Sequence, residues 1–379
     1  MKKMSLLFSS ICLSLICATA AFASGTIRIG GLFAVTGPAA FLGEPERNTA
    51  KMVIDELNRA GGVKGRKFEL VAYDTSGDAA KAVQLTTRLI KNDKVVAIIG
   101  PSTTGETMAV IPVVEKLHVP LISCSAGSKI TEPVKKWVFK TAQNDSLAVG
   151  KIYEYLQKNR RNKVSILTVS DGFGASGREQ LKSQAVRYGI TILSDDTYDP
   201  KDTDMTAQLT KIRASGSQAI ICWGTNPGPA IIARNVRQLG IKTPLFMSHG
   251  VSSKKFIALA GAAAEGIKLP SGKVIVADTL PGSDRQKKSL MSFVTDYQKH
   301  YRMEGDHFGG HAWDAVMLIR NAVNNGADTA AGIREQLERT RGFAGIGGTF
   351  NYSANDHAGL GKDAFVLVEV KNNDWKIVK

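Results

Sequence analysis

Hydroxyl groups, glycines and other small residues gather in two short segments of the first third of the chain. Residues 100–106 read Gly-Pro-Ser-Thr-Thr-Gly-Glu, residues 122–128 read Ile-Ser-Cys-Ser-Ala-Gly-Ser, and each completes a predicted strand-to-helix or strand-to-loop unit. Free backbone N–H groups at a helix N-terminus attract anions, and open α/β sheets bind ligands beyond the carboxyl ends of their strands. We therefore expect the two segments to lie side by side and to hold a carboxylate. The candidate residues are Ser102, Thr103, Thr104, Ser125, Ala126 and Gly127.

Each segment also has an interpretation that needs no ligand. Thr103 and Glu106 have the spacing of a capping box, which by itself begins a helix. Residues 122–128 are also typical of a polar surface loop. The pairing of two such loops from adjacent strand–helix units favours the binding site over both alternatives.

A glycine-rich pattern at residues 172–177, Gly-Phe-Gly-Ala-Ser-Gly, matches a dinucleotide-binding loop, with Asp195 and Asp196 about 20 residues further on. Nucleotides are scarce outside the cytoplasm, and the start of the chain predicts export. Two other interpretations are a tight turn that needs glycine dihedral angles and a strand-to-helix loop whose helix N-terminus faces a ligand. We favour the last of these.

His307 and His311, four residues apart, have a spacing that can indicate a metal site. Gly309 and Gly310 lie between them and argue against helical geometry, so we expect a helix cap or a cleft wall and no metal. The chain has no Gly-x-Ser-x-Gly, P-loop, Cys-x-x-Cys or His-Glu-x-x-His motif, and no two acids stand out as general acid and base. We expect a binding protein without a cofactor, not an enzyme.

The first 23 residues predict a secretory signal peptide. Two lysines precede an apolar run at 6–17 that is too short to span a membrane, and Ala-Phe-Ala at 21–23 fits a cleavage site. An uncleaved anchor is the alternative. Cleavage leaves Cys124 and Cys222, for which two buried free thiols are favoured and a disulfide stays open.

Length and composition narrow the class of protein. A chain of 379 residues that is 43% hydrophobic is long enough for two domains with full cores. Its net charge is +15, but only 7% of its residues are aromatic, which is few for a protein that stacks nucleic-acid bases. We expect the positive charge to attract small anions or anionic surfaces, and not nucleic acid.

Strand and helix patterns alternate along the chain in two series that separate near residues 141–146. Continuous apolar strands are typical of parallel sheets covered on both faces, so two doubly wound α/β domains are expected. The predicted strands are 26–30, 68–73, 95–99, 120–123, 164–169, 190–193, 219–222, 244–247, 365–370 and 375–378. The predicted helices are 45–59, 79–91, 106–117, 176–188, 205–214, 230–239, 284–301, 312–324 and 333–340.

Nearly the whole mature chain resembles a periplasmic solute-binding protein of the leucine/isoleucine/valine-binding type (type I), which serves ABC importers. The resemblance implies two Rossmann-like lobes joined by a three-strand hinge, with the ligand in the cleft between them. It places residues 24–143 and 278–348 in the first lobe and residues 144–277 and 349–379 in the second. The similar segments, in order, are 29–38, 60–66, 73–74, 100–105, 122–128 and 171–174.

The resemblance also implies roles for individual residues. Ser102 and Thr104 would bind the ligand carboxylate together with the backbone of Ala126. Family members often have Ala-Thr at this point, whereas here Gly127 and Ser128 follow Ala126, which makes Ser128 a candidate substitute for the threonine.

Aromatic and polar residues of the cleft walls are implied in the same way. Phe173 takes the place of a cleft aromatic residue of the second lobe, and Phe41 is its candidate counterpart in the first. Trp223 and Asn226 follow a predicted strand and would face the cleft, although Trp223 has core packing as an equal alternative. Residues 137–140 and 171–174 look closer to the branch of the family that binds aromatic carboxylates.

His249 is a departure from the family pattern. Members that bind amino acids usually have an acidic residue there, which pairs with the ligand ammonium, and a histidine cannot replace a carboxylate as a counter-ion. Either another acid such as Asp171 serves, or the ligand has no ammonium group.

The hypothesis from the sequence is a monomeric periplasmic binding protein. It would capture a small carboxylate with an apolar or aromatic body, either a branched-chain amino acid or an aromatic or keto acid, and deliver it to an inner-membrane ABC permease. The alternatives are a sensing subunit for a separate signalling receptor and a secreted enzyme that uses a nucleotide.

Overall fold

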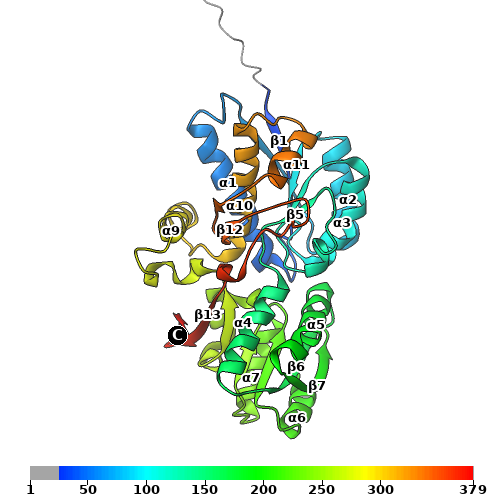
Figure 1. Cartoon of the computed structure of the whole chain (residues 1–379). Coiled ribbons are helices and arrows are strands. Elements are labelled where there is room, and N and C mark those ends of the chain that lie inside the picture. Colours follow the sequence, from blue (N-terminus) through cyan, green and yellow to red (C-terminus); the bar gives the residue numbers. More distant parts are fainter. Residues whose placement is uncertain (1–24, 379) are drawn as a thin grey trace, which may run out of the picture.

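The computed structural model describes residues 25–378, so the predicted signal peptide at 1–23 lies outside the described residues. The chain folds into two lobes placed end to end, each of them a twisted sheet with helices on both faces (Figure 1). This arrangement confirms the predicted fold class.

Lobe 1 contains a five-stranded parallel sheet. Its strands, in their order across the sheet, are β2 (Phe68–Asp74), β1 (Ile27–Phe33), β3 (Ala97–Ile99), β4 (Leu121–Ser123) and β5 (Val138–Lys140). Its other elements are α1 (Ala40–Arg59), α2 (Ala79–Lys91), α3 (Thr104–Leu117), α9 (Lys287–Tyr301), α10 (His307–Asn324), α11 (Ala330–Glu338), β11 (Phe343–Ala344) and β12 (Thr349–Phe350). Ala97 and Ile99 pack with α1 and α10, whereas Ile98 packs with α2 and α3, so β3 is apolar throughout because both of its faces are covered.

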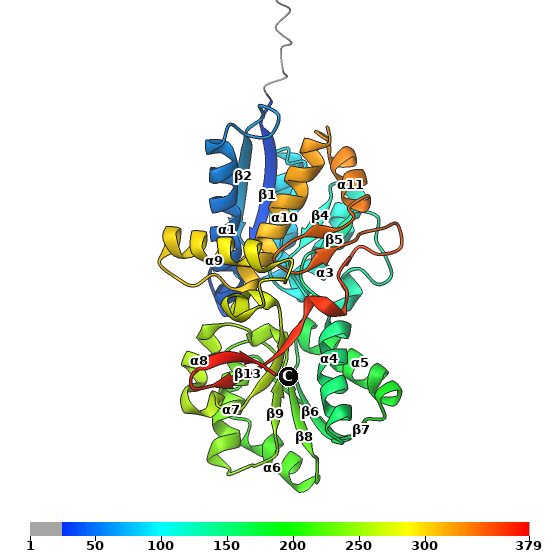
Figure 2. The same ribbon diagram turned by 60° about the vertical axis from the view of Figure 1, so that its left-hand side comes forward.

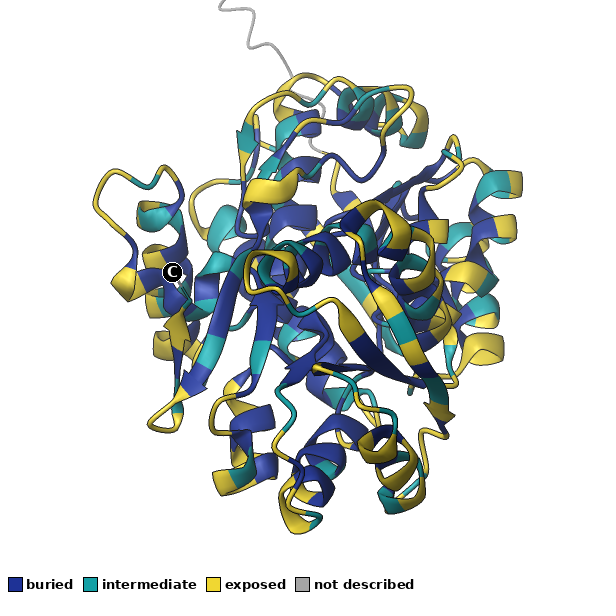
Figure 3. Ribbon diagram, turned by 60° about the horizontal axis from the view of Figure 1, so that its bottom comes forward, coloured by how far each residue is buried: buried dark blue, intermediate teal, exposed yellow. Residues whose placement is uncertain are grey.

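Lobe 2 contains a seven-stranded sheet whose first half along the chain is parallel. Its strands, in their order across the sheet, are β14 (Asp374–Ile377), β13 (Val366–Lys371), β10 (Lys268–Ser271), β9 (Leu245–Met247), β8 (Ala219–Trp223), β6 (Lys163–Val169) and β7 (Thr191–Tyr198). Its helices are α4 (Asp145–Lys158), α5 (Gly172–Ala185), α6 (Thr206–Ala214), α7 (Gly228–Gln238) and α8 (Lys254–Ala260). Ile221 packs with α4 and α5 and Ile220 with α6 to α8, so β8 is also buried on both faces. Figure 3 shows dark blue, buried strands together with strands that carry teal and yellow, more exposed residues.

The chain crosses between the lobes three times: between β5 and α4, between β10 and α9, and between β12 and β13 (Figure 2). The predicted division at 348/349 falls before the third crossover. Tyr352 still belongs to lobe 1, where its hydroxyl donates to the Lys140 carbonyl at 2.7 Å. Leu360 packs on lobe 1 and Phe365 on lobe 2, so the crossing lies between these two residues.

Two helices begin earlier than their glycines suggested. α5 starts at Gly172, so the glycine-rich pattern is the first turns of a helix and not a loop. α10 starts at His307, so the expectation that Gly309 and Gly310 argue against helical geometry there is wrong. A Cβ on Gly309 would lie 2.7 Å from the Thr49 hydroxyl of α1, which shows that close helix packing, and not a break in the helix, requires this glycine.

Within residues 25–378, no helix is long and apolar enough to cross a membrane. Cys124 and Cys222 are buried free thiols that lie in different lobes, which confirms the favoured interpretation of the two cysteines. Burial raises the pKa of the Cys222 thiol to about 12 and that of Cys124 well above its ordinary value.

We therefore predict that neither thiol of a chain that begins at Ser24 reacts with a thiol reagent at pH 8 while the protein is folded. A buried thiol is both inaccessible and protonated at this pH. Unfolding in denaturant without a reductant should then release two reactive thiols per chain. A titration that finds none after unfolding would reveal a disulfide instead.

Candidate functional site

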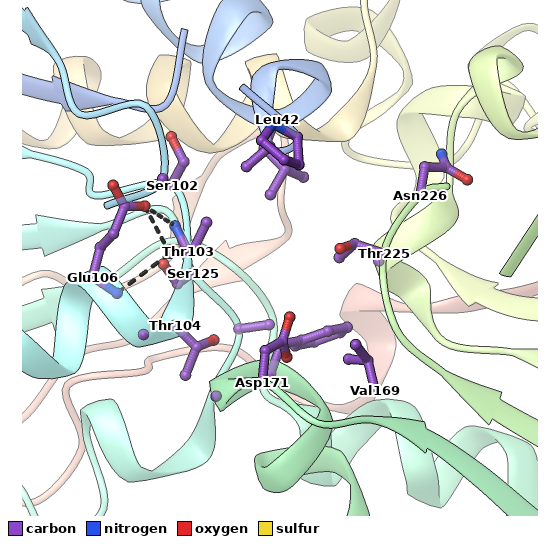
Figure 4. Close-up of a pocket in the computed structure, with 18 of the residues that line it drawn as sticks. Leu42, Ser102, Thr103, Thr104, Glu106, Ser125, Val169, Asp171, Thr225 and Asn226 are labelled. Carbon is purple, nitrogen blue, oxygen red and sulfur yellow. Dashed lines mark hydrogen bonds between the residues drawn. The ribbon is translucent and has the colours of Figure 1, made fainter. Parts of the chain in front are cut away.

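A cavity of about 310 Å³ lies between the two lobes, beyond the carboxyl ends of β3, β4, β6 and β8. Figure 4 shows its two walls: Ser102, Thr103, Thr104 and Ser125 come from lobe 1, and Val169, Asp171 and Thr225 come from lobe 2. The convergence of these loops follows from the parallel sheets, because the carboxyl ends of parallel strands meet at one edge.

Most of the sequence-predicted residues come together in this cavity, and three do not. Gly127, Phe41 and Trp223 are absent from its lining. The predicted residues that line it are Ser102, Thr103, Thr104, Ser125, Ala126, Phe173, Asn226 and His249. Their roles toward a ligand stay predictions.

The N-terminus of α3 forms the lobe 1 wall. Thr103 caps this helix, because its hydroxyl accepts the Glu106 N–H while the Glu106 carboxylate accepts the Thr103 N–H at 3.2 Å. The next residue, Thr104, is the first of α3 and lines the cavity, and its hydroxyl makes no hydrogen bond to another residue in the described part of the chain. Thr104 is therefore a free donor at the positive end of a helix dipole.

The Ser102 hydroxyl, in contrast, already forms hydrogen bonds within the protein. Its hydroxyl donates to the carboxylate of Glu46, in α1, and accepts the Ala34 N–H at 3.1 Å. Ser102 lines the cavity but has no proton left for a ligand carboxylate. Nothing in the sequence near residue 102 indicates this, because Glu46 lies 56 residues away.

The three absent residues have structural roles. Trp223 is fully buried behind Phe173 and His249, with ring centroids 5.9 and 5.8 Å away. Phe41 packs edge-to-face on Phe308 at 5.7 Å, and it is Phe308 that reaches the cavity. A Cβ on Gly127 would collide with the Thr104 side chain, so a glycine at this position leaves the space that Thr104 occupies.

Three histidines form a further part of the cavity lining. His249 follows β9, and His307 and His311 begin α10. All three are almost wholly buried, and burial lowers the pKa of each, to about 4 for His307. The four-residue spacing of His307 and His311 was the sequence signal for this wall. No group of metal-binding side chains is present among residues 25–378.

A buried pair of charges lies behind the lining and was not predicted. The Lys140 ammonium donates to the carbonyl oxygens of Ala126, at 2.6 Å, and Gly127. The Asp145 carboxylate lies 3.7 Å from Nε2 of His249. Burial lowers the pKa of Lys140 and raises that of Asp145, and the attraction between the two groups opposes both shifts.

The two lobes touch beside the cavity. A Cβ on Gly172 would lie 3.1 Å from the backbone nitrogen of Gly105, so the first turns of α5 and α3 meet almost backbone to backbone. Ser128 donates its N–H to the Ser176 hydroxyl at 3.1 Å across the same junction. Lys129 and Glu179 add an exposed ion pair at 2.6 Å.

A cavity between two doubly wound lobes that three crossovers join has the architecture of a binding protein, and the comparison with known families agrees. The periplasmic binding protein family matches residues 26–374. The chain belongs to this family. Periplasmic binding proteins capture ligands and are not enzymes, which confirms that expectation from the sequence.

Named relatives of this periplasmic binding protein match along most of their length. "Leu/Ile/Val-binding protein homolog 3" of Brucella melitensis is 24% identical over 98% of both chains. An extracellular ligand-binding receptor from Rhodopseudomonas palustris HaA2 superposes with a TM-score of 0.87 at 28% identity, over 94% of this chain and 100% of its own. A branched-chain amino acid transporter substrate-binding protein from Streptococcus pneumoniae, solved in complex with isoleucine, superposes with a TM-score of 0.81 at 27% identity. The match covers 93% of this chain and 98% of that protein's chain.

We predict that Gly172→Ala weakens ligand binding several-fold without lowering the melting temperature of the ligand-free protein. The added methyl group would press on Gly105 only when the lobes are in contact, so it disfavours the closed form. Calorimetric titration of each protein with a ligand that the original protein binds measures the change in Kd. Gly105→Ala is the matched control, because a Cβ at that position has open space around it. Unchanged affinity in Gly172→Ala would show that binding does not need this approach of the lobes.

Proposed function

We propose that this periplasmic binding protein captures a small carboxylate with an apolar body and delivers it to an ABC permease of the inner membrane. The observation that carries the proposal is the free Thr104 hydroxyl at the N-terminus of α3, next to the loop that presents Ala126. Relatives named for leucine, isoleucine and valine, and one solved with isoleucine, support a ligand of this size and kind. Export by a cleaved signal peptide and a monomeric state belong to the same proposal.

The proposed order of events begins on lobe 1. The carboxylate meets the α3 N-terminus, where Thr104 donates a hydrogen bond to it. Leu42 of lobe 1 and Val169 and Phe173 of lobe 2 then surround the apolar body. Closure is a shift of population toward the state in which both walls contact the ligand, and its extent depends on contacts made only in that state.

The proposal covers a branched-chain amino acid and an aromatic or keto acid alike. Asp171, the acid considered from the sequence, lines the cavity, but its carboxylate accepts the Gly174 N–H at 2.8 Å and caps α5. His249 takes the position at which amino-acid-binding members usually have a carboxylate. The carboxylate end of the ligand is therefore better supported than an ammonium group.

A ligand panel identifies the class of compound. Protein unfolded and refolded to remove bound ligand would be melted with leucine, isoleucine, valine, phenylalanine, benzoate, cinnamate and branched 2-keto acids. A ligand at about 1,000 times its Kd adds roughly 4 kcal/mol, a shift of several degrees. Absence of any shift with every carboxylate would contradict the proposed function.

We predict that Thr104→Val weakens binding of the best carboxylate by about 10- to 100-fold, because a hydrogen bond to a charged group contributes about 1.5–3 kcal/mol. Calorimetry measures the change. Thr87→Val, the same substitution on α2 outside the cavity, is the control and should leave the affinity close to that of the original protein. Equal affinity in Thr104→Val and the original protein would remove Thr104 from the site.

A further inference from the structure

The histidine wall of the cavity (His249, His307 and His311) offers hydrogen-bonding atoms that the protein leaves unused. His307 and His311 share one face of α10, with ring centroids 5.3 Å apart, and His249 reaches the cavity from the other lobe. At least one ring nitrogen of each histidine is buried without a partner. A buried polar atom without a partner is costly, so a ligand group that satisfies these nitrogens gains from doing so.

The neighbouring groups of His307 and His249 determine which ring nitrogen of each can accept a hydrogen bond. Nδ1 of His307 lies 2.9 Å from the Ser252 carbonyl oxygen, which can only accept, so Nδ1 carries the proton and the unpartnered Nε2 keeps its lone pair. Nε2 of His249 faces the Asp145 carboxylate at 3.7 Å, which favours a proton there and leaves a lone pair on Nδ1. Because burial keeps both rings neutral at pH 7, each presents one acceptor.

His249 lies close to the carboxylate end of the cavity. Asp145 joins the two places, because its backbone N–H donates to the Ala126 carbonyl at 3.4 Å while its side chain faces His249. A ligand held by Thr104 beside Ala126 therefore has the carbon next to its carboxylate near His249.

An ammonium group at that carbon would lack a free counter-ion. The carboxylates that line the cavity are Glu106, bonded to Thr103, and Asp171, bonded to the Gly174 N–H. Behind the lining, Lys140 and Asp145 attract each other, and the Lys140 charge also faces His249. A buried cation needs a net negative partner, whereas a neutral hydroxyl needs only an acceptor.

Resting on the proposed function, we propose that His249 accepts a hydrogen bond from a hydroxyl group on the carbon next to the ligand carboxylate, so that the preferred ligands are 2-hydroxy carboxylates. Neutral acceptors favour such a hydroxyl over an ammonium. They also favour it over a keto oxygen, which has no proton to donate, and over an unsubstituted carbon.

Two sets of four compounds test this in the original protein. The first set is 2-hydroxy-4-methylpentanoate, leucine, 4-methyl-2-oxopentanoate and 4-methylpentanoate, and the second is 3-phenyllactate, phenylalanine, phenylpyruvate and 3-phenylpropanoate. Within a set only the group at carbon 2 changes. Calorimetry should give the 2-hydroxy acid at least a tenfold lower Kd than the other three members in the set whose body fits.

Variants of His249 assign the preference to the histidine wall. His249→Leu should bring the 2-hydroxy and unsubstituted acids to within about threefold of each other, whereas His249→Gln, which keeps an acceptor, should retain the preference. His249→Glu supplies a carboxylate and should turn the preference toward the 2-amino acid. Melting curves of the ligand-free variants confirm that each is folded.

The results also separate this inference from the proposed function. If the amino, keto or unsubstituted acid binds as tightly as the 2-hydroxy acid, or more tightly, the inference is overturned while a carboxylate-binding function stands. If His249→Leu still prefers the 2-hydroxy acid, His249 does not accept the hydrogen bond from the ligand hydroxyl, and the inference is overturned. If no member of either set binds, the inference fails, and the proposed function is left to the benzoate, cinnamate and branched-chain members of the ligand panel.

Discussion

The approach of two helix N-termini across the cleft is the constraint on which the rest of the molecule depends. α3 and α5 each start directly after a parallel strand, one in each lobe, and they meet where Gly172 lies against Gly105. Each N-terminus carries a partial positive charge, so the space between them suits a negative or hydrogen-bonding group. The doubly wound topology, the three crossovers and the small residues of both loops all serve to bring these two helix ends together.

The glycines of α5 show how a pattern that suggests one chemistry can serve another purpose. Gly174 lies against the Val169 carbonyl at the end of β6, and Gly177 lies against the Trp223 indole of β8. A side chain at either position would push the helix away from the sheet. The Gly-x-Gly-x-x-Gly spacing therefore sets how closely α5 packs on lobe 2, and it needs no nucleotide to explain it. That close packing also brings Phe173 to the cavity.

The sequence predicts the fold well because local patterns control it. Apolar strands between amphipathic helices require a sheet covered on both faces, and the Thr103 capping box is complete within four residues. For the candidate site, the sequence predicts only those residues that lie in loops directly after predicted strands. The sequence does not reveal Glu46 beside Ser102 or Phe308 in place of Phe41, because each of these depends on contacts between residues far apart in the chain. The start of α10 at His307 does have a local signal, because the Asp306 side chain caps the helix by accepting the Gly309 N–H.

The buried pair of Lys140 and Asp145 links the ligand loop, the first crossover and the histidine wall. Lys140 ends β5 in lobe 1 and holds the carbonyl of Ala126, whereas Asp145 begins α4 in lobe 2 and faces His249. Burial lowers the pKa of Lys140 and raises that of Asp145, and the attraction between the two groups opposes both shifts. Because the two residues flank the first crossover, their attraction acts between the lobes where the chain passes from one to the other.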